Sequence, residues 1–370
     1  MDTSDPDITF DPDGICNHCR LADRLLPAVH WTSQDSERAL AETAEKIRKA
    51  GVGREYDCVI GLSGGVDSSY AALLAHQIGL RPLAVHFDNG WNSELAVENI
   101  QHVVEGCGFD LHTYVIDWRE FRDLQRAFLQ AGVIDVELPT DNAIVAATIG
   151  LAREHGIHYL LSGWNFATEH GLPKSWAWHK FDWTNIKAIH EAYGRVPLST
   201  FPHISTMQWR LMQLAGQGVQ TVRLLNLVNY RRDQAAAALA RQFGWRDYGG
   251  KHHESVFTKF YQGAILPRKF GIDKRRVHLS DRIRNGELAR DEALAIVSQP
   301  LYQPDELRME SDYVRKKLGF DAAEWDAIMA APPRSHRDFA SDRQFAGPVL
   351  LAFRLFRGAR RLVKSQSSHL

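Results

Sequence analysis

The stretch Cys58-Val59-Ile60-Gly61-Leu62, followed by Ser63-Gly64-Gly65-Val66-Asp67-Ser68-Ser69, decides the fold. The first five residues are a short apolar run of the kind that forms a buried strand. The next seven form a glycine-rich turn, and an amphipathic helix is expected after it, over about residues 67–78. A turn of this kind between a strand and a helix is a typical anion site, because the first backbone N–H groups of a helix are unpaired.

The alternation of strand and helix continues along the chain to about residue 200. The further elements expected are strands at 83–87, 111–116 and 158–162, and helices at 33–50, 93–106, 119–131 and 141–155. Strands that alternate with helices of this length imply a parallel sheet covered on both faces. The predicted fold class is therefore α/β, a doubly wound parallel sheet.

Beyond residue 200 the strand signal fades and helical patterns dominate. These patterns lie at 205–216, 218–229, 233–243, 286–298 and 311–318. Between them, residues 248–276 form a polar segment rich in Lys, His and Arg. The domains expected are a Cys-x-x-Cys N-terminal segment over 1–32, a nucleotide-binding domain over 33–200, a helical substrate or partner domain over 201–344, and a basic amphipathic tail over 345–370.

Composition excludes several classes of protein. The 370 residues are 44% hydrophobic and carry a net charge of -1, which argues against a dedicated nucleic-acid binder. No run of about 18 apolar residues is present to span a membrane as a helix. The N-terminus is acidic, unlike a signal peptide, and four cysteines in a chain of this length are not a disulfide framework. A cytoplasmic protein is the default expectation.

The glycine-rich turn has the chemistry of a phosphate loop. Its glycines let the backbone approach phosphate oxygens, and Ser63, Ser68 and Ser69 add hydroxyl donors. Asp67 cannot bind an anion directly, so its expected role is to hold Mg²⁺ on the phosphates. The turn is neither a Walker A loop, since no Lys precedes the Ser, nor a G-x-G-x-x-G fingerprint. The structural alternative is a glycine-rich turn whose Asp and Ser cap a helix.

At these residues the sequence resembles the PP-loop ATP pyrophosphatases, a fold also described as adenine nucleotide alpha hydrolase-like. The resemblance implies attack on the α-phosphate of ATP, which gives an adenylate and pyrophosphate. It also assigns two strand ends to the nucleotide, because open α/β sheets bind ligands at the carboxyl ends of their strands. The ATP-binding residues expected are Ser63, Gly64, Gly65, Asp67, Ser68, Ser69, His86, Phe87, Asp88 and Gly163.

Further strings narrow the resemblance to the N-acetyl sugar amidotransferases of surface-polysaccharide (lipopolysaccharide, O-antigen) and nonulosonic-acid pathways. The strings are Asp7-Ile8-Thr9-Phe10-Asp11, Gly14-Ile15-Cys16-Asn17-His18-Cys19, Leu138-Pro139-Thr140-Asp141, Asn165-Phe166-Ala167-Thr168-Glu169, Tyr248-Gly249-Gly250-Lys251-His252-His253-Glu254, Phe257-Thr258-Lys259-Phe260 and Lys269-Phe270-Gly271-Ile272-Asp273-Lys274-Arg275-Arg276. Together they cover the chain to about residue 300.

This resemblance implies that a sugar N-acetyl group is adenylated and then converted by ammonia to an acetamidino group. Developing charge on the phosphates calls for fixed cations, and the candidates are Lys174, Lys251, Lys274 and Arg275. Candidate substrate residues are Asp141, Asn165, Glu169, His252 and His253. For each of these, an ordinary surface charge or loop side chain is the alternative.

The resemblance also implies that ammonia comes from a separate glutaminase, similar to that of imidazole glycerol phosphate synthase. Asp2 occupies the position where an N-terminal-nucleophile glutaminase carries Cys. Cys58 falls in a predicted core strand and Cys107 at a helix end, so neither is placed as an activated thiol. The other partner expected is a sugar or sugar-nucleotide substrate, and no nucleic acid is expected.

Two rival functions share the phosphate loop. A tRNA thiolase or other sulfur transferase requires a reactive Cys near the adenylate and a basic face for RNA. A non-catalytic nucleotide-binding partner subunit requires neither Asp67 nor the Lys/His segment. Bound tRNA and pyrophosphate release separate these two hypotheses from the amidotransferase.

Cys16 and Cys19 have the spacing of half of a structural zinc site, which needs four ligands. The family resembled commonly has a second Cys-x-x-Cys just upstream, ending in Cys-Val-Met-Asp-Thr, and this chain opens Met1-Asp2-Thr3. We therefore expect Zn²⁺ in a zinc-knuckle-like segment whose other half lies upstream of Met1. The alternative is a pair of free thiols. The tail over 345–370 is expected either at a membrane interface or docked on its own protein.

Overall fold

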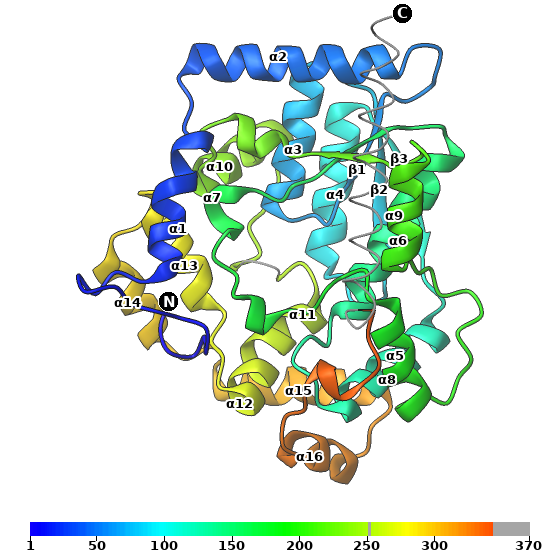
Figure 1. The fold of residues 1–370 in the computed structure, drawn as a ribbon, viewed down its shortest axis with the longest axis vertical. Helices are drawn as coiled ribbons and strands as arrows, with labels where there is room; N and C mark the ends of the chain where they lie inside the picture. The colour runs from blue at the N-terminus through cyan, green and yellow to red at the C-terminus, as the bar shows by residue number, and fades with distance from the viewer. Residues whose placement is uncertain (251–252, 343–370) are drawn as a thin grey trace, which may run out of the picture.

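The computed structural model describes residues 1–250 and 253–342. Five parallel strands form one sheet in the order β3-β2-β1-β4-β5 (Figure 1). The strands are β1 Cys58–Gly61, β2 Pro82–Asp88, β3 Asp110–Val115, β4 Tyr159–Leu161 and β5 Gln220–Val222. Successive strands run outward from β1 in one direction and then in the other. The strand order therefore reverses between β1 and β4, which is where open α/β sheets bind ligands.

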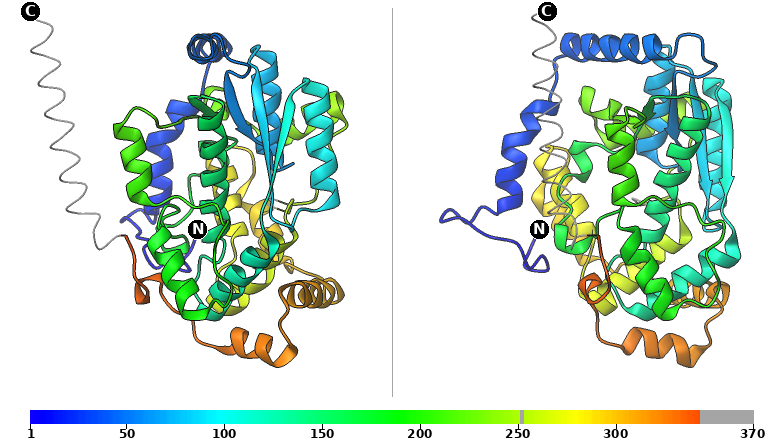
Figure 2. Two further views of the ribbon diagram at one scale, coloured as in Figure 1. Left: turned by 90° about the vertical axis from the view of Figure 1, so that its right-hand side faces the viewer. Right: turned by 45° about the vertical axis from the view of Figure 1, so that its right-hand side comes forward.

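Helices cover both faces of this sheet, as Figure 2 shows from two sides. The side chains of Cys58 and Ile60 join the core beneath one layer of helices, while Val59 between them joins the core on the other face. The first layer is α2 Ser33–Ala50, α3 Val66–Gln77, α4 Glu94–Cys107 and α10 Arg232–Phe243, and the second is α6 Leu138–Glu154 and α9 Thr206–Leu214. The predicted doubly wound parallel sheet is thus confirmed.

A second body of helices lies beyond the carboxyl ends of β2 and β3, at the bottom of Figure 1. Its core includes the fully buried Phe121, Leu124 and Phe128, and it reaches Trp91 and Ile116, which follow β2 and β3. The helices are α5 Trp118–Ala131, α8 Trp183–Tyr193, α11 Val256–Phe260, α12 Leu266–Phe270, α13 Arg275–Arg284, α14 Arg290–Ser298, α15 Pro304–Leu318 and α16 Ala322–Ala330. This arrangement places the C-terminal segment over the ligand-binding edge of the sheet.

The sequence analysis was wrong about the helix at 218–229. That stretch instead contains β5 and a short 3-10 turn over Leu224–Leu227. The strand is only three residues long and pairs with β4 at the edge of the sheet, through Tyr159↔Gln220 and Leu161↔Val222. Such a short strand is fixed by its nonlocal partner rather than by its own pattern. The sheet therefore includes a strand beyond residue 200, the expected domain boundary, and the boundaries themselves stay predictions.

Two further helices complete the description of the fold. An N-terminal helix, α1 Asn17–Leu25, precedes α2, and α7 Phe166–Glu169 follows β4. No helix among residues 1–250 and 253–342 is long and apolar enough to cross a membrane. The basic tail over 345–370, with its expected membrane contact, and the candidate residues Lys251 and His252 lie outside the described residues.

Candidate active site

The phosphate loop depends on glycine at two positions. Gly64 has φ of +80°, and a Cβ there would collide with the backbone carbonyl of Ala96 on α4. Gly65 is the N-cap of α3 and makes no side-chain cap, so the first turn of that helix stays open to a ligand. The loop is held by its own serines, because Gly65 N donates to Ser63 Oγ at 3.2 Å and Ser68 Oγ donates to Gly65 O at 3.1 Å.

Gly163 brings the end of β4 against this loop. A Cβ on Gly163 would lie 2.8 Å from the backbone N of Ser68 and 2.9 Å from the carbonyl carbon of Asp67. No side chain larger than hydrogen fits at this distance without a shift of the backbone. The contact therefore joins the ends of β1 and β4 at the reversal point of the sheet.

A segment nearly two hundred residues later in the sequence forms hydrogen bonds with the same loop. Trp245 Nε1 donates to Gly64 O at 3.0 Å, and Val66 N donates to the Tyr248 hydroxyl at 3.2 Å. Ser63 Oγ donates to Glu254 Oε1 at 3.3 Å. A phosphate that binds the Val66 N–H must displace the Tyr248 hydroxyl. An anion at this N–H would therefore require Tyr248 to move.

Asp67 is fixed by a buried tyrosine. The Tyr230 hydroxyl donates to Asp67 Oδ1, and Tyr230 is only 3% exposed. Burial and the neighbouring Asp67 carboxylate raise the pKa of Tyr230 well above its ordinary value, so the phenol stays a proton donor at physiological pH. Asp67 itself lines a large cavity at the carboxyl edge of the sheet.

This cavity has a volume of about 650 Å³, enough for a nucleotide together with part of a second substrate. Its walls come from the phosphate loop, from residues that follow β4, and from residues between Asp247 and Tyr302. The charged residues that line it are Asp67, Glu169, Arg232, Asp247, Glu254, Lys259, Lys274, Arg275 and Arg282, together with His253 and His278. The carboxyl edge of the sheet and the C-terminal helices thus line the same cavity.

Most cations of this cavity are already paired with protein groups. Arg232 contacts Asp247 at 3.0 Å, and Lys259 contacts Glu306 at 2.7 Å. Arg282 contacts Asp233 at 2.9 Å. These carboxylates hold the cations in place and neutralise part of their charge.

Arg275 is paired more completely than the other cations. It contacts Asp273 at 2.8 Å and donates to the carbonyls of Ile296, Val297 and Gln299 at the end of α14. Its donors therefore cap a helix, so its geometry favours a positioning role over direct contact with phosphate.

Lys274 differs from the other cations. It precedes α13 as its N-cap, and its ammonium makes no hydrogen bond or ion pair within residues 1–250 and 253–342. Burial lowers the pKa of Lys274, opposed by the nearby Glu137 carboxyl. A desolvated ammonium without a close partner is suited to bind a phosphate or a leaving group.

Acidic residues lie behind Lys274. Burial raises the pKa of Glu137 to about 7, opposed by Lys274, and Glu137 also accepts a hydrogen bond from the Thr258 hydroxyl. Lys180 bridges Asp135 and Asp141, at 2.7 Å to each. Asp141, a candidate substrate residue, therefore belongs to an ion-pair cluster and does not line the cavity.

The structure brings together nine of the predicted site residues. Those that line the cavity are Ser63, Gly65, Asp67, Ser68, Gly163, Glu169, His253, Lys274 and Arg275. Burial lowers the pKa of His253, which favours its neutral form. The chemical roles proposed for these residues stay predictions, while their proximity is a property of the fold.

Other predicted site residues have structural contacts instead. Asn165 caps α7 by accepting from Thr168 N at 2.9 Å. His86 links β1 to β2 through Leu62 O at 3.1 Å, and Phe87 stacks on Tyr114. Ser69 is buried, and the Asp88 carboxylate accepts a hydrogen bond from Gly90 N. Lys174 is exposed and does not line the cavity. The expected contact of residues 86–88 with a base stays a prediction, because their backbone pairs with β3 and the Asp88 carbonyl accepts from Ile116 N at 3.1 Å.

Sequence reasoning missed several residues that line the cavity or hold its residues in place. Tyr230 gave no signal, because its contact with Asp67 joins positions 163 apart. His278 and Arg282 were missed although they follow Lys274 at intervals of four residues. That spacing puts all three on one face of α13 and could have indicated a cationic helix face.

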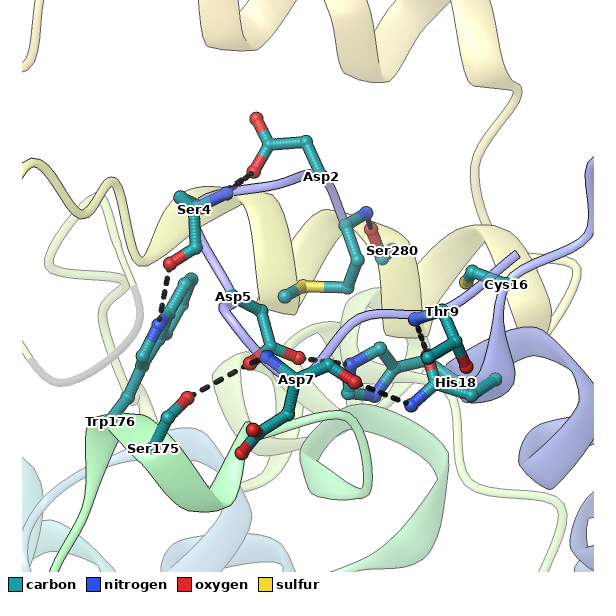
Figure 3. Close-up of polar contacts among 12 residues, drawn as sticks. Asp2, Ser4, Asp5, Asp7, Thr9, Cys16, His18, Ser175, Trp176 and Ser280 are labelled. Carbon is teal, nitrogen blue, oxygen red and sulfur yellow. Dashed lines mark hydrogen bonds and ion pairs between the residues drawn. The ribbon is translucent and has the colours of Figure 1, made fainter.

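The N-terminal segment lies beside Ser280 of α13 and beside the turn at Ser175, as Figure 3 shows. The Met1 amine donates to Ser280 Oγ at 2.6 Å, and Asp5 contacts His18 at 2.7 Å and Ser175 Oγ at 2.9 Å. Cys16 and Cys19 lie with their sulfur atoms 3.5 Å apart. Among residues 1–250 and 253–342, no group of three or more His, Cys, Asp or Glu is arranged to hold a metal ion. The expected zinc site thus finds no support here, since His18 pairs with Asp5.

Comparisons with known proteins find a similarity to a described family in the C-terminal part of the chain. A family described as "LPS biosynthesis protein WbpG-like, C-terminal domain" matches residues 254–352, less than half of the chain. No curated protein matches. Residues 254–352, which supply Lys259, Lys274 and Arg282 to the cavity, are therefore similar to the C-terminal domain of WbpG-like lipopolysaccharide biosynthesis proteins.

Solved structures show more distant similarity. NMN synthetase from Francisella tularensis is 14% identical with a TM-score of 0.40, covering 79% of this chain and 98% of that one. The NH3-dependent NAD synthetase of Campylobacter jejuni in complex with the nitrate ion is 13% identical with a TM-score of 0.36, covering 82% and 99%. The U34-tRNA thiolase NcsA of Methanococcus maripaludis with its [4Fe-4S] cluster is 11% identical with a TM-score of 0.35, covering 81% and 89%.

The contact between Gly163 and Ser68 yields a direct prediction. In Gly163→Ala the new methyl group must push the end of β4 away from the phosphate loop, so ATP should bind about tenfold more weakly. Calorimetric titration with ATP measures this loss. Gly150→Ala is the matched control, because no heavy atom lies within 4 Å of its new Cβ. Wild-type affinity in Gly163→Ala would show that this contact does not shape the site.

Proposed function

We propose that this chain is the synthetase component of an ATP-dependent N-acetyl sugar amidotransferase. In this proposal it adenylates the carbonyl oxygen of a sugar N-acetyl group and replaces that oxygen with nitrogen from ammonia. The observation that carries the proposal is the single cavity that holds both the phosphate loop and Lys274. Lys274 lies within residues 254–352, which resemble a lipopolysaccharide biosynthesis domain.

The first step joins the acceptor to the nucleotide. The amide oxygen attacks the α-phosphorus of ATP, the bond to the bridging oxygen of pyrophosphate breaks, and pyrophosphate leaves with those electrons. Negative charge grows on the departing phosphates. The open first turn of α3 and the Lys274 ammonium are the groups that would stabilise this charge.

The second step replaces oxygen by nitrogen. Ammonia adds to the activated carbon, and the carbon–oxygen bond breaks so that AMP leaves with the former acetyl oxygen. The product is an amidinium group, and one proton is released to a base or to solvent. His253 and Glu169 line the cavity and are the candidate acceptors for that proton.

A magnesium ion fits this chemistry. Mg²⁺ in nucleotide sites is usually held by one or two carboxylates together with phosphate oxygens and water, so a larger protein cage is not needed. Asp67, positioned by Tyr230 at the loop, would hold the ion. The ion would neutralise phosphate charge beside a loop that Glu254 also approaches.

The positions of the cysteines argue against a sulfur-transferase function. None of the four cysteines, all of which lie in the described part of the chain, lines the cavity. Burial raises the pKa of Cys58 far above its ordinary value and that of Cys107 to about 12, so neither thiol is activated. The same burial disfavours Cys58 and Cys107 as a glutaminase nucleophile, and a separate glutaminase remains our proposed source of ammonia.

Lys274 gives the first test of this proposal. Lys274→Ala should lower kcat/KM for pyrophosphate release by about a hundredfold or more, because a buried cation facing the phosphates is lost. Lys174→Ala, at an exposed position outside the cavity, should have little effect. An equal loss of kcat/KM in both variants would show that Lys274 has no special role in pyrophosphate release.

The pH profile tests the charge of Lys274. Burial lowers its pKa, and a lysine is charged below its pKa, so the wild-type rate should fall as pH rises through a value under 10.5. Lys274→Arg keeps its charge at every pH and should lack this alkaline fall, whatever its maximal rate. A fall that persists unchanged in Lys274→Arg would assign it to another group.

The nitrogen source gives the next test. The purified chain, supplied with ATP, Mg²⁺ and a panel of nucleotide-linked N-acetyl sugars, should form an amidine with ammonium but not with glutamine. Mass spectrometry of the sugar detects this product directly. Glutamine-dependent turnover by this chain alone would contradict the separate glutaminase, and loss of ATP without any amidine would contradict the proposed reaction.

A further inference from the structure

A second cavity, of about 480 Å³, lies beside the first. Its mouth is formed by exposed residues, namely His30, Thr32, Asn229 and Arg231. Its floor is formed by buried residues, namely Ala167, Leu225, Tyr230 and Asn285. The cavity is therefore a funnel that leads from the surface into the protein and ends at the wall of the active site.

Neighbouring residues of the chain line the two cavities at two places. Ala167 lines the funnel and Thr168 lines the active-site cavity. Arg231 lines the funnel and Arg232 lines the active-site cavity. Tyr230 links the two, because it lines the funnel while its hydroxyl donates to Asp67 in the active site.

The funnel is preformed by hydrogen bonds between side chains and backbone. Asn229 accepts from Trp31 N at 2.7 Å and donates to Trp31 O at 2.5 Å. Asn226 accepts from Phe166 N at 2.8 Å, and Asn285 donates to Tyr230 O at 3.3 Å. These bonds fix the walls of the funnel from four separate stretches of the chain.

The lining suits a small neutral molecule. Arg231 and His30 are its titratable side chains apart from Tyr230, and no carboxylate is among the described residues that line it. An ammonium cation would meet no counter-charge there, whereas neutral ammonia can hydrogen-bond to amide groups. A nucleotide or a sugar enters the larger cavity instead, where the phosphate loop lies.

We propose that this funnel is the entry for ammonia, and that its mouth faces the protein that supplies it. The inference rests on the proposed function, in which ammonia attacks an acceptor already joined to AMP. That intermediate fills the first cavity, so a nucleophile arriving through the wall beside Asp67 need not pass it. Passage requires the Tyr230 side chain to shift from Asp67, which couples entry to the site where the phosphates bind.

The experiment blocks the funnel and leaves the active site alone. Val228→Trp adds bulk to a half-buried wall residue, and Arg231→Trp adds it at the exposed mouth. Gln234→Trp is the matched control, since Gln234 is exposed on α10 and lines neither cavity. Each variant is assayed for the KM of ammonium in amidine formation, and for ATP–pyrophosphate exchange with acceptor sugar but without ammonium. Thermal unfolding shows that each variant is folded.

In Val228→Trp and Arg231→Trp the KM for ammonium should rise about tenfold or more, while pyrophosphate exchange stays within about twofold of wild type. Gln234→Trp should match wild type in both assays. If folded Val228→Trp has the wild-type KM for ammonium, the proposal is wrong. If Val228→Trp does not fold, a wild-type KM for ammonium in Arg231→Trp overturns the proposal instead. Absence of any ammonium-dependent product in the wild-type chain refutes the proposed function itself, and the funnel's role with it.

Discussion

The first turn of α3 is the constraint on which the site depends. Its N–H groups can bind an anion only if the backbone before them can come close, and Gly64 and Gly65 allow that approach. Gly163 then lets β4 end against the same turn. These glycines are required by contact distances, and every other feature of the site is arranged around the loop that they permit.

The C-terminal segment completes this loop. Trp245, Tyr248 and Glu254 hydrogen-bond to it, and residues 254–282 supply Lys259, Lys274 and Arg282 to the cavity. The likeness to a lipopolysaccharide biosynthesis domain falls on residues 254–352, which supply much of this added wall of the cavity.

Much of the sheet could be predicted from the sequence because its signals are local. The strands β1, β2 and β4 are short apolar runs, and two of the helices between the strands have Ser or Asp before them and Gly after them, namely Ser93 and Gly108 at α4 and Asp117 and Gly132 at α5. β5 could not be predicted in this way, since three residues at an edge depend on pairing with β4. The proximity of Asp67 and Lys274 was expected from the family resemblance, whereas the contact of Tyr230 with Asp67 and the funnel depend on distant positions. Asn165 and Asp141 were assigned to substrate from their motifs, although local capping and ion pairing account for both.

The central claim is that the acetyl oxygen of the acceptor leaves as part of AMP. It is tested most directly with an acceptor sugar labelled with ¹⁸O in its N-acetyl carbonyl, incubated with the chain, ATP, Mg²⁺ and ammonium. The account predicts that the ¹⁸O is recovered in the phosphate of AMP, one label for each amidine formed, with unlabelled pyrophosphate. Unlabelled AMP, or ADP and inorganic phosphate in place of AMP and pyrophosphate, would contradict it.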